Sequence, residues 1–404
     1  LSVRLLPSNR EIKGYIDTLN SRVCLMKFNQ VKFQDSRTRT YLGSPSLIRL
    51  DDGTILATHD YFGKGCPKNH QQEEHLTSVY RSEDNGQSWQ NTTHIANAFW
   101  STLFKHRGDV YLLGCSQQYG SIVIRRSTDG GFTWTYPKDA DSGLLLAGGD
   151  FREPPNYHCA PMPVVEKSGW LYRAFEDCTP CVWGTGFQSF TISAEVDANL
   201  LSAQSWTISN KIPFDPGWIP DEWSHTGTQL EKPGWLEGNI VISPNEEIWN
   251  ILRFNSRPLV DKAAIVKVEE GGRQVSFDPA TGFIDLPGGM SKFTIRYDPS
   301  TQHYLTLSNN NTDPNFPAQR NELSLCVSTD LINWQHKLIL IEDDSDLDFA
   351  ESVRLTGFQY VDWQFDERDL IYLVRTAYDG AHNYHDANRI TFHRLSDFRQ
   401  YILN

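Results

Sequence analysis

The sequence predicts an all-β protein that folds as a single β-propeller. Short runs rich in Val, Ile, Leu, Tyr and Trp recur along the chain between clusters of Gly, Asp, Asn and Pro, which is typical of strands separated by turns. A turn motif repeats at the spacing of propeller blades, and a strand–turn–strand pattern occurs six times. Because no linker or low-complexity stretch interrupts these repeats, we expect residues 1–404 to form one domain.

The repeated turn motif reads S-x-D-x-G-x-[ST]-W. Full copies occupy residues 82–89 and 127–134, and a shortened relative occupies residues 328–334. Asp and Gly favour a tight turn between two strands, under which the Trp can pack. The Asp residues of the full copies lie at positions 84 and 129, a spacing of 45 residues. A period of roughly 40 to 50 residues with four short strands in each repeat indicates a propeller.

The six strand–turn–strand segments are interpreted as the first two strands of successive blades. They cover residues 46–59, 100–115, 159–173, 240–253, 292–308 and 353–375. Insertions around residues 213–235 and 310–322 lie between them, and residues 1–40 remain unassigned. A seventh blade built from the N-terminal segment would account for those residues, so seven blades are favoured although six can be counted. Closure of the ring by both termini would leave no exposed sheet edge.

Composition limits the classes of partner. The chain has 37 Lys and Arg against 50 Asp and Glu, a net charge of −13, which argues against nucleic acid. An anionic substrate remains compatible because a local arginine cluster can bind it. No apolar run of about 18 residues exists, so no membrane span is predicted. The first residue is not Met, and we expect a secreted or periplasmic monomer from which a signal peptide has been removed.

Three arginines end apolar second strands of three different hairpins. Arg173, Arg253 and Arg375 are expected to converge on one pocket, where they could clamp the carboxylate of a uronic or sialic acid. A buried arginine needs an anionic partner. The alternative is that each forms an ion pair with a neighbouring carboxylate, such as Glu176 or Asp379.

Other residues are candidate proton carriers or sugar contacts. Tyr157 opens the third hairpin and could act as general acid or base beside Arg173, or could simply pack as a ring. His59 and His75 lie in the first blade and could carry protons or be structural. The stretch after Arg375, which includes His385 and Asn388, is either a sugar-contacting loop or a hydrogen-bonded turn.

A C-x-x-C motif follows the strand that carries Arg173. Cys178 and Cys181 could supply two ligands of a structural zinc site, with His158, Cys159 and His225 not far away in the sequence. The alternatives are a disulfide or two free thiols. The chain has seven Cys, an odd number, so it is not a fully paired disulfide scaffold. No other cofactor is expected to be required.

The turn motifs resemble those of sialidases, which are six-bladed and use an arginine triad with a Tyr nucleophile. Sialidases also carry an Arg-Ile-Pro motif on the first blade, whereas this chain has Gly43-Ser44-Pro45 in that place. The pattern more closely resembles seven-bladed propellers that act on rhamnose- and glucuronate-containing glycans: the α-L-rhamnosidases of glycoside hydrolase family 145 and the ulvan lyases. That resemblance rests on Gly43-Ser44-Pro45 followed by residues 58–63, on residues 157–161 with Arg173, and on Arg375 with the ending 385–388.

This resemblance implies a function and a set of site residues. In the lyase branch, Tyr157, Arg173 and His59 would handle the uronate proton and the leaving oxygen. In the rhamnosidase branch a single His near the N-terminus is catalytic, but residues 1–58 contain no His, and Gln30 or Gln34 stands there instead. The substrate-binding residues expected on this basis are Arg253, Arg375, His75, His225, His385 and Asn388. We therefore expect a carbohydrate-active protein that targets the rhamnose–glucuronate linkage of plant or algal polysaccharides, with hydrolysis, β-elimination and binding without catalysis as the alternatives.

Overall fold

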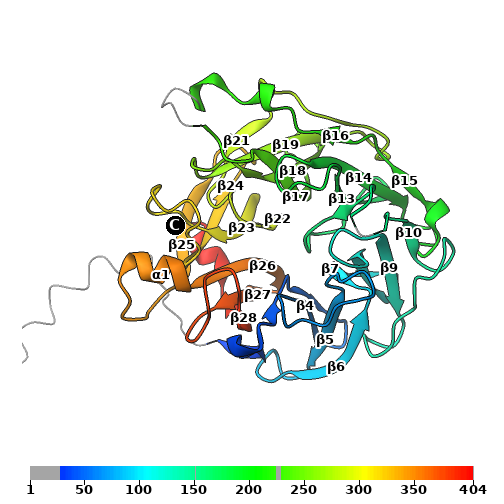
Figure 1. The fold of residues 1–404 in the computed structure, drawn as a ribbon, viewed down its shortest axis with the longest axis horizontal. Coiled ribbons are helices and arrows are strands. Elements are labelled where there is room, and N and C mark those ends of the chain that lie inside the picture. Colours follow the sequence, from blue (N-terminus) through cyan, green and yellow to red (C-terminus); the bar gives the residue numbers. More distant parts are fainter. Residues whose placement is uncertain (1–27, 151, 224–228, 404) are drawn as a thin grey trace, which may run out of the picture.

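The computed structural model describes residues 28–150, 152–223 and 229–403, and these form six antiparallel sheets placed radially around a central axis (Figure 1). The prediction of a β-propeller is confirmed, with six blades rather than the favoured seven. Each predicted hairpin supplies inner strands of one blade. The described part of the N-terminal segment does not build a blade of its own, because it adds one strand to the sixth.

Blades I to III occupy the first half of the ring. Blade I contains β2 (Tyr41–Leu42), β3 (Ser46–Arg49), β4 (Ile55–Phe62), β5 (Leu76–Ser82) and β6 (Gln90–Ala96). Blade II contains β7 (Phe99–His106), β8 (Asp109–Cys115), β9 (Ile122–Ser127) and β10 (Leu144–Leu146). Blade III contains β11 (Tyr157–His158), β12 (Val165–Lys167), β13 (Trp170–Cys178), β14 (Phe187–Glu195), β15 (Trp206–Ile208) and β16 (Ile212–Pro213).

Blades IV to VI complete the ring. Blade IV contains β17 (Gly234–Ile242), β18 (Ile248–Asn255), β19 (Lys262–Val268), β20 (Val275–Ser276) and β21 (Phe283–Asp285). Blade V contains β22 (Ile295–Asp298), β23 (His303–Asn309), β24 (Glu322–Ser328) and β25 (Gln335–Glu342). Blade VI contains β26 (Gly357–Asp366), β27 (Asp369–Ala377), β28 (Arg389–Leu395) and β1 (Asn29–Phe33). The short helix α1 (Phe349–Leu355) connects blades V and VI.

Both ends of the described chain meet in blade VI. Strand β1 pairs with β28 in antiparallel register, with Asn29 opposite Phe392 and Phe33 opposite Arg389. The outermost strand of this blade therefore comes from the N-terminal side and the other three from the C-terminal side (Figure 1). This pairing closes the ring, as the sequence predicts, and covers an edge that would otherwise be open.

The core is divided among the blade interfaces. Seven apolar clusters lie within the described residues, and six of them lie one between each pair of neighbouring blades. Leu56 and Val79 of blade I, for example, pack with Leu103 and Leu112 of blade II. Inner strands are covered on both faces by adjacent blades, which explains why their sequences read as nearly continuous apolar runs. Burying one such side chain contributes about 1.5–3 kcal/mol.

The three Asp-containing turns are structural, as predicted. In the first, the Asp84 carboxylate accepts hydrogen bonds from Ser82 Oγ at 2.8 Å and from Ser88 Oγ at 2.6 Å, and Trp89 Nε1 donates to Gly86 O at 3.1 Å. Gly86 has a φ of 84°, which favours glycine at this turn. The second and third turns repeat these bonds around Asp129 and Asp330.

All three turns join the third and fourth strands of a blade, and they define one face of the ring. Ser82 pairs with Ile55, at the beginning of β4, while Thr77 pairs with Asp60 near its end. Asp60 therefore lies toward the opposite face. None of the helices in the described part of the chain is both long and apolar enough to cross a membrane.

Candidate functional site

A cavity of about 240 Å³ opens on the face opposite the Asp-containing turns. Its lining combines titratable groups with aromatic rings. The titratable groups are Asp60, Glu74, His158, Glu237, Tyr360, Arg375 and His385. The aromatic rings are Phe62, Phe99, Trp100, Tyr119 and Trp183. This mixture of convergent polar groups and aromatic walls is typical of a sugar-binding or catalytic pocket.

Three of the lining residues lie on different strands that share the same kind of backbone distortion. Trp100 in β7, Glu237 in β17 and Tyr360 in β26 have φ values of 50°, 57° and 54°, in the left-handed region. Each coincides with a shift of register in the innermost strand of its blade. Such bulges re-aim a side chain out of the normal alternation, and strained non-glycine residues concentrate at functional sites. Here the distortion brings all three side chains to the cavity.

Tyr360 and Glu237 form a short polar contact in the cavity. The Tyr360 hydroxyl donates to Glu237 Oε1 at 2.6 Å, and Arg253 Nη1 donates to Glu237 Oε2 at 2.8 Å and to the Tyr360 oxygen at 3.2 Å. Burial acts to raise the pKa of Glu237, but Arg253, His158 and Tyr360 together hold it below its usual value. Burial and Glu237 raise the pKa of Tyr360. The phenol therefore keeps its proton while the neighbouring carboxylate is ready to accept it.

Three arginines surround this pair. Arg253 lies opposite Leu236 in blade IV and Arg375 lies opposite Gln359 in blade VI, so corresponding registers in two blades place each arginine beside a bulged residue. The guanidinium carbons of Arg375 and Arg320 lie 4.8 Å and 5.9 Å from the centre of the Tyr360 ring.

Glu237 neutralises only part of this positive charge. Neither Arg320 nor Arg375 has a carboxylate within ion-pair distance among the described residues: Arg320 donates to Gln359 Oε1, and Arg375 donates to His385 O at 2.6 Å. The buried Nε atoms of Arg253 and Arg375 have no partner in the described chain. The positive charge of Arg320 and Arg375 is therefore not neutralised by an ion pair within the described residues.

Asp60 is a buried carboxyl group near the end of β4. It is 1% exposed, and burial raises its pKa to about 7. Its Oδ2 accepts from Trp100 N at 2.9 Å. The Thr77 hydroxyl lies 2.7 Å from both Asp60 Oδ1 and Ala98 O, but it has one proton to donate. Donation from Thr77 to Asp60 favours the carboxylate and lowers its pKa, but burial is the larger effect and raises the pKa.

A second pair of ionisable groups supports the Glu237 bulge. His158 Nδ1 lies 2.8 Å from Glu176 Oε2, and Gly238 N donates to Glu176 Oε1 at 3.0 Å. Glu176 is fully buried, so its carboxylate is tied between the imidazole and the backbone of the residue that follows Glu237. The His158 ring also packs at 4.4 Å from Trp100 and lines the cavity.

The structure brings together three residues that the sequence singles out, Arg253, Arg375 and His385. His59 is not among them, because the alternation of β4 turns it away from the cavity and presents Asp60 instead. The His59 ring lies between Asp60 O, at 2.9 Å, and the Tyr80 hydroxyl, at 3.2 Å, and burial lowers its pKa to about 4. That environment makes it a structural, neutral histidine.

Tyr157 and Arg173 do not meet at the cavity, contrary to the expectation. Tyr157 packs against Phe190 with ring centroids 5.9 Å apart, under the Lys211 ammonium, and burial raises its pKa to about 12. Arg173 is fully buried and donates to Ala174 O at 2.7 Å and to Ala160 O. It lies four residues before Asp177, the partner of Tyr157 in the sheet, a separation of about 13 Å along the strand. Arg173 therefore belongs to the interior of the ring.

The remaining predicted site residues lie elsewhere. His75 Nδ1 accepts from Asn97 N at 3.2 Å, and Asn388 bonds to the backbone of Tyr378 and Asp379, which stabilises a turn. Gln30 is exposed on β1, the outermost strand of blade VI, and is remote from the cavity. His225 lies outside the described residues.

Cys178 and Cys181 are present as two free thiols, and Cys178 Sγ donates to Pro180 O at 3.7 Å. Within the described ranges, no group of three or more His, Cys, Asp or Glu side chains could hold a metal ion. The predicted zinc site therefore lacks a ligand set in this part of the chain.

Sequence reasoning missed Asp60, Glu237, Tyr360 and Arg320. Asp60 is one residue beyond His59, and Glu237 and Tyr360 each follow the residue that pairs with a recognised arginine. A comparison of the hairpins with one another would have found these positions, although the bulge that aims them leaves no signal in composition. Arg320 lies in the insertion around residues 310–322, which interrupts the repeat.

A scan of known protein families finds no match, and a search of curated proteins finds none either. Solved structures with a similar fold include an α-L-arabinanase of Penicillium chrysogenum complexed with arabinobiose, at 14% identity and a TM-score of 0.56, which covers 92% of this chain and 98% of that one. An α-L-arabinofuranosidase from Fusarium graminearum matches at 12% identity and a TM-score of 0.59, covering 93% and 99%. The leech intramolecular trans-sialidase complexed with 2,7-anhydro-Neu5Ac matches at 11% identity and a TM-score of 0.57, covering 94% and 72%.

These similarities establish the fold. They agree with the expectation of a carbohydrate-active propeller, since the named neighbours act on sugars, but at such identities they do not assign the rhamnosidase or lyase family that the sequence pattern resembles.

Proposed function

We propose that this protein is a retaining exo-glycosidase that releases a terminal acidic sugar, of the sialic acid type, from glycans. The observation that carries the proposal is the Tyr360–Glu237 hydrogen bond of 2.6 Å inside a cluster of three arginines. Glycosidases with a Tyr nucleophile, the sialidases, are a recognised exception to the usual pair of catalytic carboxylates.

A tyrosine nucleophile suits an anomeric carbon that carries a carboxylate. An ionised Asp or Glu would be repelled by that carboxylate, whereas a phenol approaches as a neutral group. In the proposed step the Tyr360 oxygen bonds to the anomeric carbon and its proton passes to Glu237. Because the pKa of Glu237 is lowered and that of Tyr360 is raised, the proton is on Tyr360 and Glu237 is ionised before this transfer.

Asp60 is the proposed proton donor. As the bond from the anomeric carbon to the leaving oxygen breaks, Asp60 gives its proton to that oxygen, for which a pKa of about 7 is well matched near neutral pH. In the second step a water gives a proton to Asp60 and attacks the anomeric carbon, and Tyr360 leaves with the proton returned by Glu237. Two displacements, each accompanied by two proton transfers, restore the enzyme.

Arg375, which lines the cavity, is the proposed carboxylate contact, and Arg320 and Arg253 beside the Tyr360–Glu237 pair add positive charge to the site. Bidentate arginine contacts are strong and geometrically specific for carboxylates. The cavity, at about 240 Å³, is below the roughly 300–1,000 Å³ of pockets for drug-sized ligands, which favours one terminal sugar rather than an internal segment of a polysaccharide.

A uronic acid target is the second candidate. The same arginines would bind glucuronate, so cleavage at a rhamnose–glucuronate linkage, by hydrolysis or by β-elimination, is supported by the charge of the cavity. Binding of an acidic glycan without cleavage rests on that charge as well.

A secreted or periplasmic location is part of the proposal and is tested by cell fractionation.

The test is a panel of substrates. Aryl glycosides of N-acetylneuraminic acid, glucuronic acid, L-rhamnose and L-arabinofuranose are incubated with the protein and the released phenol is measured, while ulvan is followed by the ultraviolet absorbance of unsaturated uronate. The proposal predicts cleavage of the neuraminide and its loss in Tyr360→Phe. Preference for an arabinofuranoside or rhamnoside, or a gain in absorbance with ulvan, would contradict it in favour of a neutral-sugar glycosidase or a lyase.

A further inference from the structure

A groove lined by cationic and aromatic side chains continues from the cavity onto the rim of blade IV. Its volume is about 740 Å³, and it is lined by Trp183, Lys232 and Arg257, among others. Trp183 lines both this groove and the cavity, so the two spaces meet at its ring. A glycan whose terminal sugar occupies the cavity would place its next residue here.

Three loops form the groove and hold one another in place. Asn255 Nδ2 donates to Glu231 O at 2.8 Å and to Lys232 O at 2.9 Å, and Glu231 N donates to Arg257 O at 2.8 Å. Gly184 has a φ of 82°, and a Cβ there would lie 2.4 Å from Lys232 O, so glycine is required where the Trp183 loop meets this segment. The groove is therefore shaped by backbone contacts and by the Asn255 amide, and its shape does not depend on its cationic side chains.

The cations of the groove are not used by the fold. Arg257 is half-buried and its guanidinium has neither an ion pair nor a hydrogen bond among the described residues. Lys232 is exposed and likewise has no ion pair in the described ranges. Glu231 is the one acidic residue of the lining, so the groove carries a net positive charge in a chain whose total is −13. Such a local excess of positive charge favours an anionic ligand.

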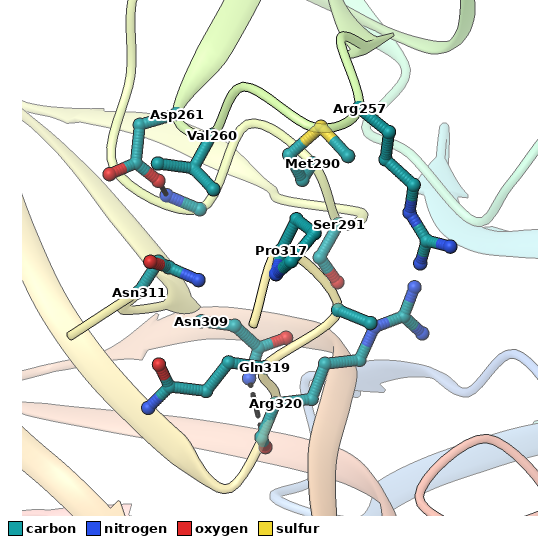
Figure 2. A pocket seen from close by; sticks show the side chains of 12 residues that line it. Arg257, Val260, Asp261, Met290, Ser291, Asn309, Asn311, Pro317, Gln319 and Arg320 are labelled. Atoms are coloured by element: carbon teal, nitrogen blue, oxygen red, sulfur yellow. Dashed lines mark hydrogen bonds between the residues drawn. The ribbon is translucent and has the colours of Figure 1, made fainter. Parts of the chain in front are cut away.

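Arg257 also connects the groove to the carboxylate site. Together with Arg320 it lines a small pocket between blades IV and V, and Figure 2 shows both guanidinium groups extending to the same side of that pocket, away from Asp261. Arg320 in turn faces the Tyr360 ring. The cations thus form a continuous series from the reaction centre outward.

Trp183 provides a flat surface at the junction. Its side chain is 40% exposed, and the Arg253 guanidinium carbon lies 5.8 Å from the ring centroid. Cation–π contact with Arg253 holds the ring without covering it. An exposed aromatic ring beside free cations can stack on a sugar ring while the cations bind its acid group.

We infer that this groove is a leaving-group subsite for a second acidic sugar, so that the preferred substrates are chains in which one acidic residue is joined to another. The inference rests on the proposed function, since it assigns the residue on the far side of the bond that is cut. Arg257 is the main determinant and Lys232 adds long-range attraction.

The experiment compares two substrates that differ only in the second residue. Release of N-acetylneuraminic acid is measured from its α-linked dimer and from its lactoside. The variants are Arg257→Gln and, as a matched control, Arg273→Gln. Arg273 is exposed beyond the Val268 end of β19, on the opposite face of the ring, and it also has no ion pair among the described residues.

The wild type should show the higher kcat/KM on the dimer. Arg257→Gln should lower kcat/KM on the dimer by about tenfold, in line with the loss of a charge-assisted hydrogen bond, and leave the lactoside within about twofold. Arg273→Gln should change neither. Salt at about 1 M should reduce the preference for the dimer in the wild type.

Two results would overturn the inference without touching the proposed function: equal cleavage of both substrates, or a loss in Arg257→Gln that is the same on both. If no substrate is cleaved, binding of the dimer and of the lactoside is measured by quenching of tryptophan fluorescence. Tighter binding of the dimer that is lost in Arg257→Gln would support the cationic groove as a binding site for an acidic sugar and refute the glycosidase. No binding of either would refute both.

Discussion

Replacement of Asp60 by Asn tests the protonation state on which the proposed chemistry depends. Asp60 is buried, with a pKa of about 7 against an ordinary value of 3.8. Asn keeps the size of the side chain and an acceptor for Trp100 N, but it cannot ionise. Any pH-dependent difference between the two proteins therefore reports on this carboxyl group.

The magnitude follows from the difference in pKa. A carboxyl group whose pKa is raised by folding contributes stability that is fully present below about pH 4 and is lost as the pH rises through about 7. At 1.36 kcal/mol per pKa unit, the wild type should lose roughly 4 kcal/mol relative to Asp60→Asn between pH 4 and pH 8. Activity should follow the same group, because kcat/KM should fall above about pH 7 as the proton donor ionises.

The assay is urea-induced unfolding of both proteins at a series of pH values. Asp84→Asn serves as the control of opposite sign, because hydrogen bonds from Ser88 and Ser82 lower the pKa of Asp84 to about 2, so its contribution is lost only as the pH falls toward that value. A stability difference for Asp60→Asn that does not change with pH, or that grows in favour of the wild type as the pH rises, would show that Asp60 is ionised and would refute its role as the acid.

Three further substitutions have expected outcomes. Tyr360→Phe should lower kcat by roughly 10³-fold or more with little change in stability, measured on the aryl neuraminide; retention of activity would exclude a tyrosine nucleophile. Arg375→Gln should raise KM for an acidic sugar by about 10–100-fold, the loss of a charge-assisted contact, and an equal effect on a neutral glycoside would contradict the carboxylate site. Glu176→Gln should lower kcat by about tenfold with KM nearly constant, because the Gly238 contact that positions Glu237 is weakened; a change confined to KM would argue for direct substrate contact by His158 instead.

The fold could be predicted because its signals are local. The turns at Asp84, Asp129 and Asp330 use side-chain hydrogen bonds within a few residues, and these bonds follow directly from the motif. The inner hairpins are apolar because neighbouring blades cover both faces. The number of blades could not be predicted in this way. The sequence of β1 carries no motif that shows whether it is the outer strand of an existing blade or part of an additional blade.

The site could be predicted only in part because its geometry depends on irregular backbone. Arg253 and Arg375 end regular strands and were recognised, and Arg173 resembles them in sequence but lies deeper in its blade. Glu237 and Tyr360 reach the cavity through left-handed residues in bulged strands, which composition does not reveal. Asp60 was missed because side chains alternate between the two faces of β4. Choosing the neighbouring His59 replaces a residue that faces the cavity with one that faces the interior.

The most direct test of the account is to trap the covalent intermediate. A fluorinated sialosyl fluoride slows breakdown of the glycosyl–enzyme, so the modified residue can be located by peptide mass spectrometry after proteolysis. The account predicts one sialosyl adduct on Tyr360, absent from Tyr360→Phe and reversed by slow hydrolysis. An adduct on Glu237, or turnover of the reagent without any adduct, would contradict the assignment of Tyr360 as the nucleophile.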